Sequence, residues 1–301
     1  MTPLDIENRL VLGTAQLGLD YGVANRAGQP DARRAAAIVK EAWARGIREF
    51  DTAQAYGQSE TVLGKALSAS GLSHQAQVIS KFDPGLDHAH KGDLKAAVQR
   101  SLTSLNVRRI RVMMLHDERL LALWNQGLAD TLQELVAAGA VEKIGVSVYT
   151  PAAARQALKT DGIEAVQVPM SILDRRFEQN GALDLARAQH KEIFIRSVFL
   201  QGLLLMPVDH IPPALAATRP LISELARCAR KFQISRLKLA LAGVKKLAPQ
   251  CKIVVGAETP AQVTEICAAW PAELPDDIWP LLDGFSRGIE AHLLNPAKWS
   301  V

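Results

Sequence analysis

Cysteine is scarce in this chain, with three residues in 301, at positions 228, 251 and 267. Their number is odd, none forms a CxxC pair, and no cluster of histidines accompanies them. A disulfide framework or a structural zinc site needs paired or more closely spaced cysteines. We therefore expect three reduced thiols, no metal centre and a cytoplasmic protein.

Excess charge and long apolar runs are also missing. Lysine and arginine total 35 against 31 acidic residues, and the net charge of +4 is spread along the chain. A balance this mild argues against a nucleic-acid or anionic-membrane partner. No apolar run has the length needed to cross a bilayer, and the first ten residues contain two acids and no apolar core segment. The sequence predicts a protein that is neither secreted nor inserted in a membrane.

Short strand-like segments alternate with longer helix-like segments along the whole chain, which is 48% hydrophobic. Strands such as AVQV and KIVVG are apolar at most positions, as in a parallel sheet that is covered on both faces. The predicted strands are 10–14, 47–51, 77–81, 110–116, 143–148, 164–168, 192–197 and 252–255. The predicted helices are 31–45, 59–69, 93–105, 124–138, 151–158, 181–189, 221–231, 236–247 and 260–269.

Eight β/α units without a Pro/Gly/Ser linker predict one α/β domain over residues 1–301, a closed (β/α)8 TIM barrel with its active site in the loops at the carboxyl ends of the strands. A doubly wound open sheet is the alternative, but LGTAQLG lacks the GxGxxG spacing typical of that fold. Thr-Pro pairs at 150–151 and 259–260 predict capped helix starts, and Gly46 and Gly139 predict left-handed helix ends.

Four polar residues stand where three of these strands end. Asp51, Lys81 and His116 close apolar runs, and Tyr56 lies on the loop just after Asp51. Taken singly, each has an ordinary structural explanation, as a turn cap, a solvated strand end, a hydrogen-bonded core imidazole or a packing aromatic. Their coincidence on adjacent strands, at the end of a barrel where ligands bind, favours a catalytic group.

These four side chains suit a proton donor for a carbonyl group. A free phenol has a pKa of about 10, and a nearby ammonium lowers that pKa, so Lys81 is expected to make Tyr56 a better acid. Asp51 would keep the lysine charged, and neutral His116 would donate an N–H to the substrate oxygen or relay the proton. Because the set lacks metal ligands and a nucleophile, we expect a cofactor that delivers hydride.

The same residues, with GTAQLG near the start, SETVLGKAL after the tyrosine and QGLL after the seventh strand, resemble the aldo-keto reductases over almost the whole chain. The spacing DTAxxYGxSE is the most specific part of the match. The resemblance implies a (β/α)8 barrel, an NADPH lying across the carboxyl-terminal mouth, and reduction of aldehydes or ketones to alcohols. Tyr56 would be the general acid, tuned by Lys81 and Asp51, and His116 would orient the carbonyl.

A set of cofactor contacts is also implied by the resemblance. Asp51 would approach the nicotinamide ribose, and Ser147 and Gln167 would bind the carboxamide. The segment after the seventh strand would line the pyrophosphate, and the residues after the eighth strand would precede a helix N-terminus that suits a phosphate. In order along the chain, the remaining implied positions are Arg196, Phe199, Leu200, Gln201, Gly256, Ala257, Gln262 and Glu265.

Several positions depart from the family pattern. Val148 replaces an asparagine that is common after the strand-five serine. Arg196 stands where an aromatic usually stacks on the nicotinamide, and its planar guanidinium can also stack. Gly256, Ala257 and Gln262 replace the cationic group that often holds the adenosine 2′-phosphate, so the sequence leaves NADH open beside NADPH.

The substrate pocket is expected to have walls from Tyr21, Phe82, the stretch 174–177 and the segment around Trp299. Arg175 and Arg176, inside that stretch, would either pair with an anionic substrate or lie solvated. The polar stretch QLGLDYGVANRAGQ suggests a hydroxylated substrate such as a sugar derivative.

Two other functions stay open. Lys81 could act as a Schiff-base nucleophile, as in barrel aldolases, although the adjacent Asp51 and Tyr56 favour a lysine that stays charged. The chain could also be an NADP(H)-binding regulatory subunit with little turnover. The expected assembly is a monomer or a small homo-oligomer.

Overall fold

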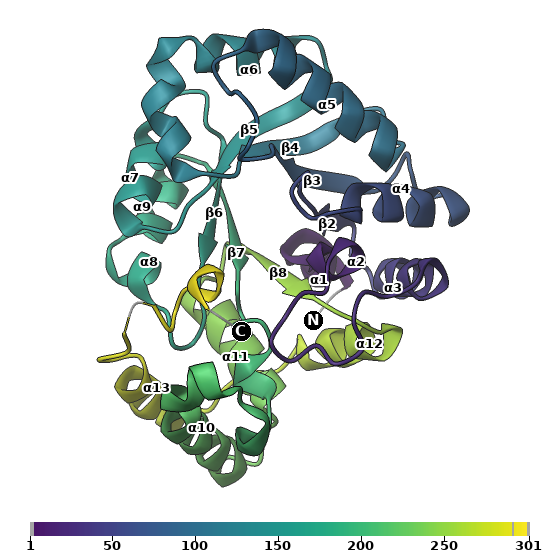
Figure 1. Ribbon diagram of the computed structural model, residues 1–301. Helices are drawn as coiled ribbons and strands as arrows, with labels where there is room; N and C mark the ends of the chain where they lie inside the picture. The colour runs from purple at the N-terminus through teal and green to yellow at the C-terminus, as the bar shows by residue number, and fades with distance from the viewer. Residues whose placement is uncertain (1–2, 291, 300–301) are drawn as a thin grey trace.

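The computed structural model describes residues 3–290 and 292–299. Eight parallel strands follow one another around a closed barrel, in which the last strand pairs with the first (Figure 1). The predicted barrel is confirmed, and an open sheet is excluded because the β8–β1 pairing leaves no sheet edge. The strands are β1 (Leu10–Gly13), β2 (Glu49–Asp51), β3 (Gln77–Lys81), β4 (Ile110–Leu115), β5 (Val141–Ser147), β6 (Ala165–Pro169), β7 (Glu192–Arg196) and β8 (Lys252–Gly256).

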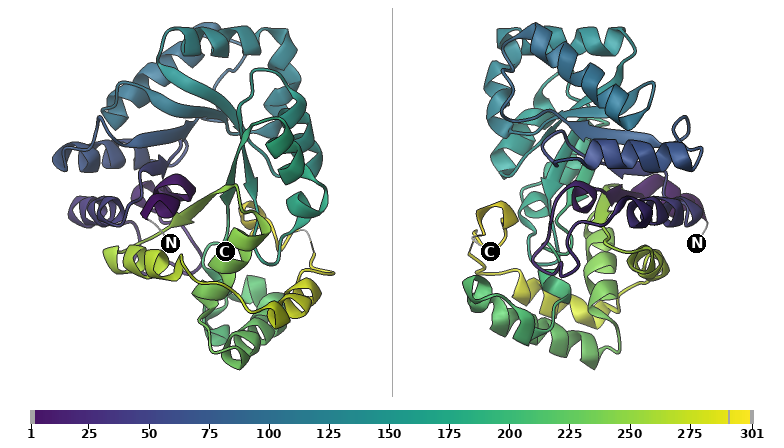
Figure 2. Two further views of the ribbon diagram at one scale, coloured as in Figure 1. Left: turned by 180° about the vertical axis from the view of Figure 1, so that it is seen from behind. Right: turned by 45° about the vertical axis from the view of Figure 1, so that its right-hand side comes forward.

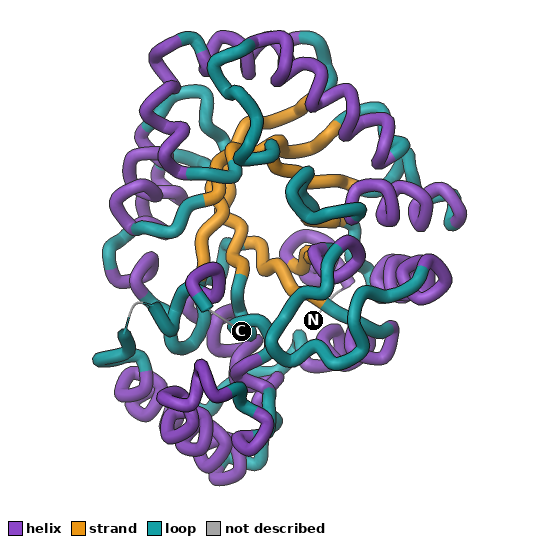
Figure 3. The backbone as a smooth tube through the Cα atoms, in the orientation of Figure 1, coloured by secondary structure: helices purple, strands orange, loops and turns teal. Residues whose placement is uncertain are grey.

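Helices surround the strands, as the purple segments around the orange ring in Figure 3 show. Short 3-10 turns follow β4 and β7 and recur near the C-terminus. The α-helices are α1 (Pro3–Arg9), α2 (Ala15–Gly18), α3 (Ala32–Ala44), α4 (Ser59–Ala69), α5 (Lys91–Leu105), α6 (Leu128–Ala137), α7 (Pro151–Lys159), α8 (Arg176–Gln179), α9 (Ala182–Ala188), α10 (Arg219–Lys231), α11 (Arg236–Leu247), α12 (Pro260–Ala269) and α13 (Trp279–Phe285).

The predicted helix boundaries are confirmed where the sequence supplies a cap. The hydroxyls of Thr150 and Thr259 accept hydrogen bonds from the backbone N–H three residues on, and Gly46 and Gly139 have φ of 96° and 73°. One predicted helix, 124–138, begins too early. A 3-10 helix occupies Glu118–Gln126, and Gly127, at φ 100°, separates it from α6. A left-handed residue cannot continue a right-handed helix.

The barrel has two apolar layers. The larger one packs the helices onto the outer face of the strands. The smaller one fills the interior of the barrel, and its members come from β1, β3, β4, β6, β7 and β8: Val11, Ile79, Val112, Met114, Ala165, Phe194 and Val254. Because successive side chains of a strand point to opposite faces, the residue two positions beyond each of these points inward as well.

A network of charged side chains closes the amino-terminal end of the barrel. Glu49, Glu192 and Lys252 are the first residues of β2, β7 and β8. Arg111 donates two hydrogen bonds of 2.9 and 2.8 Å to the Glu192 carboxylate, Lys143 donates one of 2.5 Å to the same group, and Lys252 pairs with Glu49. Charges at this depth are paired with one another, which leaves the opposite end for a ligand.

The longer loops lie at the opposite end of the barrel, where the strands have their carboxyl ends. The right-hand view of Figure 2 places the N- and C-terminal ends of the chain on opposite sides of the molecule. The loop between α2 and α3, dark purple in Figure 1, runs across the same end as the C-terminal segment. The active-site loops of a (β/α)8 barrel belong to this end.

Candidate active site

The inward-facing position nearest the carboxyl end of each strand carries the predicted site. Counting two residues on from the interior cluster gives Gly13, Lys81, His116, Gln167, Arg196 and Gly256. Asp51 pairs in register with Gly13, and Ser147 pairs with Gln167, so these two side chains belong to the same layer. Side chains alternate between the two faces of each of the eight strands, so residues that are far apart in the sequence come together at one mouth of the barrel.

Asp51 and Lys81 form a buried ion pair at the centre of this layer. The Lys81 ammonium donates to Asp51 Oδ1 at 2.7 Å and to the carbonyl of Thr52 at 2.8 Å, and Lys81 is fully buried. The other carboxylate oxygen of Asp51 accepts from Gln167 Nε2 at 2.7 Å. Burial lowers the pKa of Lys81, and the Asp51 carboxylate opposes that change. Asp51 thus acts as the counter-ion that the sequence predicted.

Tyr56 lies against this pair and against His116. Its ring meets the His116 ring edge-on, with centroids 5.6 Å apart, and the Lys81 ammonium lies 5.0 Å from the Tyr56 ring centroid. The four predicted catalytic side chains are therefore brought together.

The predicted lowering of the Tyr56 pKa is wrong. Burial, and then the negative charge of Asp51, raise the pKa of Tyr56 above its ordinary value, while Arg196 lowers it. The ammonium of Lys81 faces the ring, and its hydrogen bonds go to Asp51 and to Thr52. The cation that favours the phenolate is Arg196.

His116 follows the last residue of β4 and is held neutral. Burial lowers its pKa to about 3, assisted by the positive charges of Lys81 and Arg196. Its Nδ1 is buried and has no hydrogen-bond partner within the described residues. A neutral imidazole can offer one N–H to a ligand oxygen, as the sequence predicted.

A pocket of about 380 Å³ opens beside the four residues. Its wall comes from the start of the chain, from the segment after β7 and from the segment spanning β8 and α12. Of the predicted site residues, Asp51, Tyr56, Arg196, Phe199, Gln201, Gly256, Gln262 and Glu265 line this pocket. Lys81, Ser147, Gln167, Leu200 and Ala257 are buried behind its wall, and His116 also lies outside the lining.

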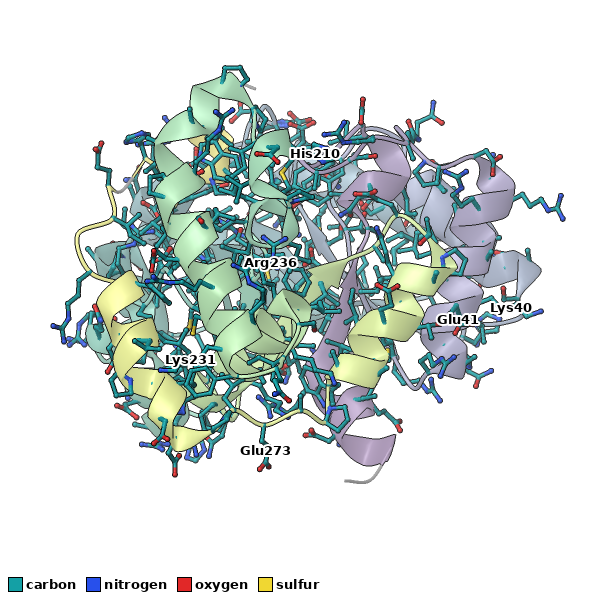
Figure 4. The ribbon with its side chains drawn as sticks, turned by 90° about the horizontal axis from the view of Figure 1, so that it is seen from below. Lys40, Glu41, His210, Lys231, Arg236 and Glu273 are labelled. Carbon is teal, nitrogen blue, oxygen red and sulfur yellow. The ribbon has the colours of Figure 1, made fainter. Side chains whose placement is uncertain are left out.

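Backbone strain marks the wall after β7. Ser197, Leu200 and Gln201 have φ of 63°, 47° and 54°, in the left-handed region that side chains other than glycine rarely adopt. Such strain persists only where surrounding contacts hold it, and it clusters at ligand sites. Further along the same segment, Arg236 on α11, labelled in Figure 4, donates to the carbonyls of Leu205 and Met206 at 2.5 and 2.6 Å.

The start of α12 offers a phosphate fewer free N–H groups than the sequence suggested. A Cβ at Gly256 would lie 2.1 Å from the side-chain amide of Gln16, so a larger residue here would require Gln16 to move. Two backbone N–H groups next to α12 are already bound, that of Gln262 by the Thr259 hydroxyl and that of Glu258 by Gln262 Oε1. Fewer free amides therefore face a phosphate here than an uncapped helix start would offer.

Sequence reasoning missed the residues that hold the loop after β5. Tyr149 stacks on the guanidinium of Arg196, 4.2 Å from its ring centroid. The Glu118 carboxylate accepts hydrogen bonds from the backbone N–H groups of Tyr149 and Thr150, and from the Thr150 hydroxyl, at 2.6 to 3.0 Å. No motif signals these contacts, because each joins loops that follow different strands.

Comparison with known proteins decides the family. The model of the aldo/keto reductase family matches residues 9–287. The chain belongs to the aldo-keto reductase family. It is 27% identical to the NADH-specific methylglyoxal reductase of Escherichia coli K12, over 94% of this chain and 96% of that protein. It is 26% identical to the pyridoxine 4-dehydrogenase of the same organism, over 93% and 99%.

Solved structures support the fold of this aldo-keto reductase. The glycerol dehydrogenase of Gluconobacter oxydans matches with a TM-score of 0.74 at 22% identity, over 94% of each chain. An aldo/keto reductase of Klebsiella pneumoniae, solved with NADP and acetate, matches with a TM-score of 0.72 at 21% identity, over 92% of this chain and 91% of that one. The resemblance noted in the sequence is confirmed at the level of family and fold.

The mouth of this aldo-keto reductase suits the amide of a nicotinamide. Gln167 is fully buried, its Nε2 is bound to Asp51, and its Oε1 has no partner within the described residues. A buried carbonyl oxygen without a donor is costly, and an amide N–H from a ligand would satisfy it. Ser147, next to Gln167 in the sheet, supplies a second polar group.

The predicted substrate wall is only partly present in this aldo-keto reductase. Tyr21 lines the pocket, whereas Phe82 is fully buried outside it and Trp299 donates to the carbonyl of His292. Arg176 is paired with Asp174, and Arg175 is paired with Glu178 and Asp283. These two arginines hold the segment after β6 in place, so neither is free for an anionic substrate.

The described residues hold no candidate metal centre and no candidate membrane span. Within residues 3–290 and 292–299, no group of three histidine, cysteine or acidic side chains could hold a metal ion. No helix in those residues is both long and apolar enough to cross a membrane.

Proposed function

We propose that this protein is an NAD(P)H-dependent oxidoreductase that reduces an aldehyde or ketone to an alcohol, with Tyr56 as the general acid. The observation that carries the proposal is the convergence of Asp51, Tyr56, Lys81 and His116 beside one pocket. The family assignment supports the reaction class, and the orphaned Gln167 Oε1 supports the cofactor. A bound nicotinamide dinucleotide would supply the hydride.

Tyr56 protonates the carbonyl oxygen as negative charge develops there. The phenol is protonated at neutral pH and so has a proton to donate, and Arg196 is the cation that lowers its pKa toward the operating pH. The phenolate that results is stabilised by the positive charge of Arg196 until solvent returns the proton. His116, held neutral, presents an N–H to the same oxygen and fixes the orientation of the carbonyl.

Asp51 positions the Lys81 ammonium, and Gln167 in turn positions Asp51. Asp51 holds the Lys81 ammonium at 2.7 Å, and Gln167 holds the other oxygen of the same carboxylate. Each of these side chains is constrained by the next, so the proton donor is preorganised before substrate binds. Because Lys81 is fully enclosed and donates to two acceptors, the arrangement does not favour Schiff-base chemistry at its nitrogen.

The adenosine end of the pocket bears on the choice of dinucleotide. NADPH is the cofactor that the resemblance implied. Two acidic side chains, Glu258 and Glu265, line this end of the pocket, and carboxylates disfavour a 2′-phosphate. NADH is therefore the second candidate, and a relative that is NADH-specific by name supports it. Titration with both dinucleotides separates the two.

The decisive experiment compares wild-type protein with Tyr56→Phe. Both proteins are titrated with NADPH and NADH, and turnover is followed by NAD(P)H absorbance with a panel of aldehydes, ketones and aldose sugars. We expect the two proteins to bind the dinucleotide alike, and the variant to lose roughly 10²- to 10⁴-fold in kcat, the usual contribution of a general acid.

Two other outcomes would overturn the proposal. A wild-type protein that binds neither dinucleotide has no hydride source. Tight binding without turnover on any carbonyl compound, together with a stable hetero-complex on pull-down, would instead support a regulatory subunit.

A further inference from the structure

Arg196 occupies an unusual place in the mouth. It is the last residue of β7 and follows Phe194 of the interior cluster by two positions, so its side chain points into the barrel mouth and lines the pocket. The guanidinium stacks on Tyr149 and donates to the carbonyl of Val148 and to the Ser197 hydroxyl, both at 3.3 Å. These contacts fix the plane of the guanidinium.

The charge of Arg196 is not neutralised by any ion pair. Among the described residues, no carboxylate lies within 4.0 Å of its guanidinium, whereas Lys81 is matched by Asp51. His116 adds no negative charge. The remaining charged side chains on the pocket wall are Arg26 on the loop after α2, and Glu258 and Glu265 near α12. The part of the pocket beside Tyr56 therefore carries one surplus positive charge.

The position of this charge relative to the reacting ring follows from the proposed function, on which this inference rests. The nicotinamide ring must lie close to the carbonyl that Tyr56 protonates. Its amide would bind Gln167 Oε1, a buried acceptor that has no donor within the described residues. Gln167 is on β6, and Arg196 is on the neighbouring strand and one inward-facing position nearer the mouth. A nicotinamide ring placed in this way binds Gln167 through its amide and has its reacting carbon near Tyr56. The Arg196 guanidinium is then its neighbour on the β7 side.

We propose that Arg196 selects the redox state of the cofactor, because its unpaired guanidinium disfavours the positively charged oxidised nicotinamide and favours the neutral, electron-rich reduced ring. A planar cation stacks well on a neutral aromatic face and is repelled by a cationic one. The same charge stabilises the Tyr56 phenolate left after proton transfer. Arg196 thus favours binding of the reduced cofactor and release of the oxidised one, and it raises the potential of the bound couple.

The expected size follows from the usual effect of a charge about 4–6 Å away, which changes the balance between a charged and a neutral form by tenfold or more. We expect wild-type protein to bind the reduced dinucleotide more tightly than the oxidised one. Arg196→Gln should lower the ratio of the oxidised to the reduced dissociation constant by about tenfold. A tenfold change corresponds to a drop of about 30 mV in the potential of the bound couple.

The test measures both dissociation constants, by protein-fluorescence quenching and by isothermal titration calorimetry, for wild type and three variants. Arg196→Lys keeps the positive charge but lacks the planar guanidinium, so the ratio of the oxidised to the reduced dissociation constant should stay close to that of wild type. Arg26→Gln is the matched control, since it removes a positive charge from the same wall on an exposed loop, and its ratio should equal that of wild type. A redox titration of bound dinucleotide gives the potential without turnover.

The possible outcomes test the role of Arg196 separately from the proposed reductase function. A wild-type ratio that is unchanged in Arg196→Gln, with both dinucleotides bound, overturns the role of Arg196 and leaves the proposed reductase intact. The same holds if Arg26→Gln lowers the ratio as much as Arg196→Gln does. Wild-type protein that binds neither form overturns the proposed function and this inference together.

Discussion

At the scale of single residues, Asp51 bears on the stability of the fold as well as on the proposed reaction. It is the partner of a fully buried ammonium whose other acceptor is a backbone carbonyl. A buried charge that loses its partner typically costs about 3–5 kcal/mol. The Asp51 carboxylate is therefore also needed for the stability of the folded chain.

Asp51→Asn should lower the free energy of unfolding by about 3–5 kcal/mol, because the Lys81 ammonium is left buried without a counter-charge. The double variant Asp51→Asn/Lys81→Met should recover much of that loss, since no charge is left in the site. Urea denaturation of the three proteins measures the difference. A single variant as stable as wild type, or a double variant less stable than the single, would contradict this explanation.

His116 makes a separate prediction about pH. Its pKa is lowered to about 3 in the folded protein, against an ordinary value of about 6.5, so between these pH values the unfolded chain binds a proton that the folded chain excludes. Stability should therefore fall as the pH drops below about 6.5, by about 2 kcal/mol at pH 5 from this residue. His116→Gln should remove that part of the slope.

The measurement for His116 is twofold. Denaturation at pH 7 and pH 5 compares wild type with His116→Gln, and NMR follows the imidazole resonances directly. An imidazole that titrates near pH 6.5 would show that the ring is solvated and free to charge.

At the scale of elements, the approach of α4 to α5 depends on one glycine. A Cβ at Gly64 would lie 2.1 Å from the carbonyl oxygen of Ser104 and less than 3 Å from the backbone of Leu105. Backbone cannot move aside as a flexible side chain can. The glycine in SETVLGKAL is therefore required for the packing of α4 against α5.

Gly64→Ala should destabilise the protein by about 1–3 kcal/mol through overpacking, despite the better helix propensity of alanine. Gly284→Ala is the matched control, because Gly284 is also helical and no atom lies within 4 Å of its Cβ position. That variant should be neutral or more stable by up to about 1 kcal/mol. Equal effects of the two substitutions in thermal denaturation would show that contact with α5 is not the cause.

Elements were predictable from the sequence because their signals are local. Strand apolarity, Thr-Pro caps and helix-ending glycines act within a few residues, and they placed all eight strands. The four catalytic candidates also followed, since each closes or follows a strand and the barrel brings such positions together. The cofactor contacts at Ser147, Phe199 and Gln201 stay predictions that the binding experiments address.

What failed depended on distances between segments remote in sequence. The sign of the pKa change at Tyr56 comes from burial and from the negative charge of Asp51. Arg175 reaches Asp283, and Arg196 reaches Tyr149, through folds of the chain that no local pattern records. Residue type alone cannot say which partner a charge will find.

At the scale of the whole molecule, the pocket joins parts of the chain that are far apart. Its wall combines residues from positions 13–26 with residues from positions 196–210 and 254–266, and the barrel closes along the β1–β8 pairing in the same region. A ligand that touches all three segments binds the folded chain and not the unfolded one. Binding must then stabilise the fold as a whole.

We therefore expect the preferred dinucleotide to add about 2.7 kcal/mol to the free energy of unfolding at one hundred times its dissociation constant, and to raise Tm by several degrees. Hydrogen exchange should slow in the loop after α2 and in the strained segment after β7, because both face the ligand. Arg26→Gln, with one fewer wall contact, should show a smaller rise at the same concentration. A Tm that does not move with either dinucleotide, or protection confined to α6 and α7 on the other side of the barrel, would mean that this pocket is not where the cofactor binds.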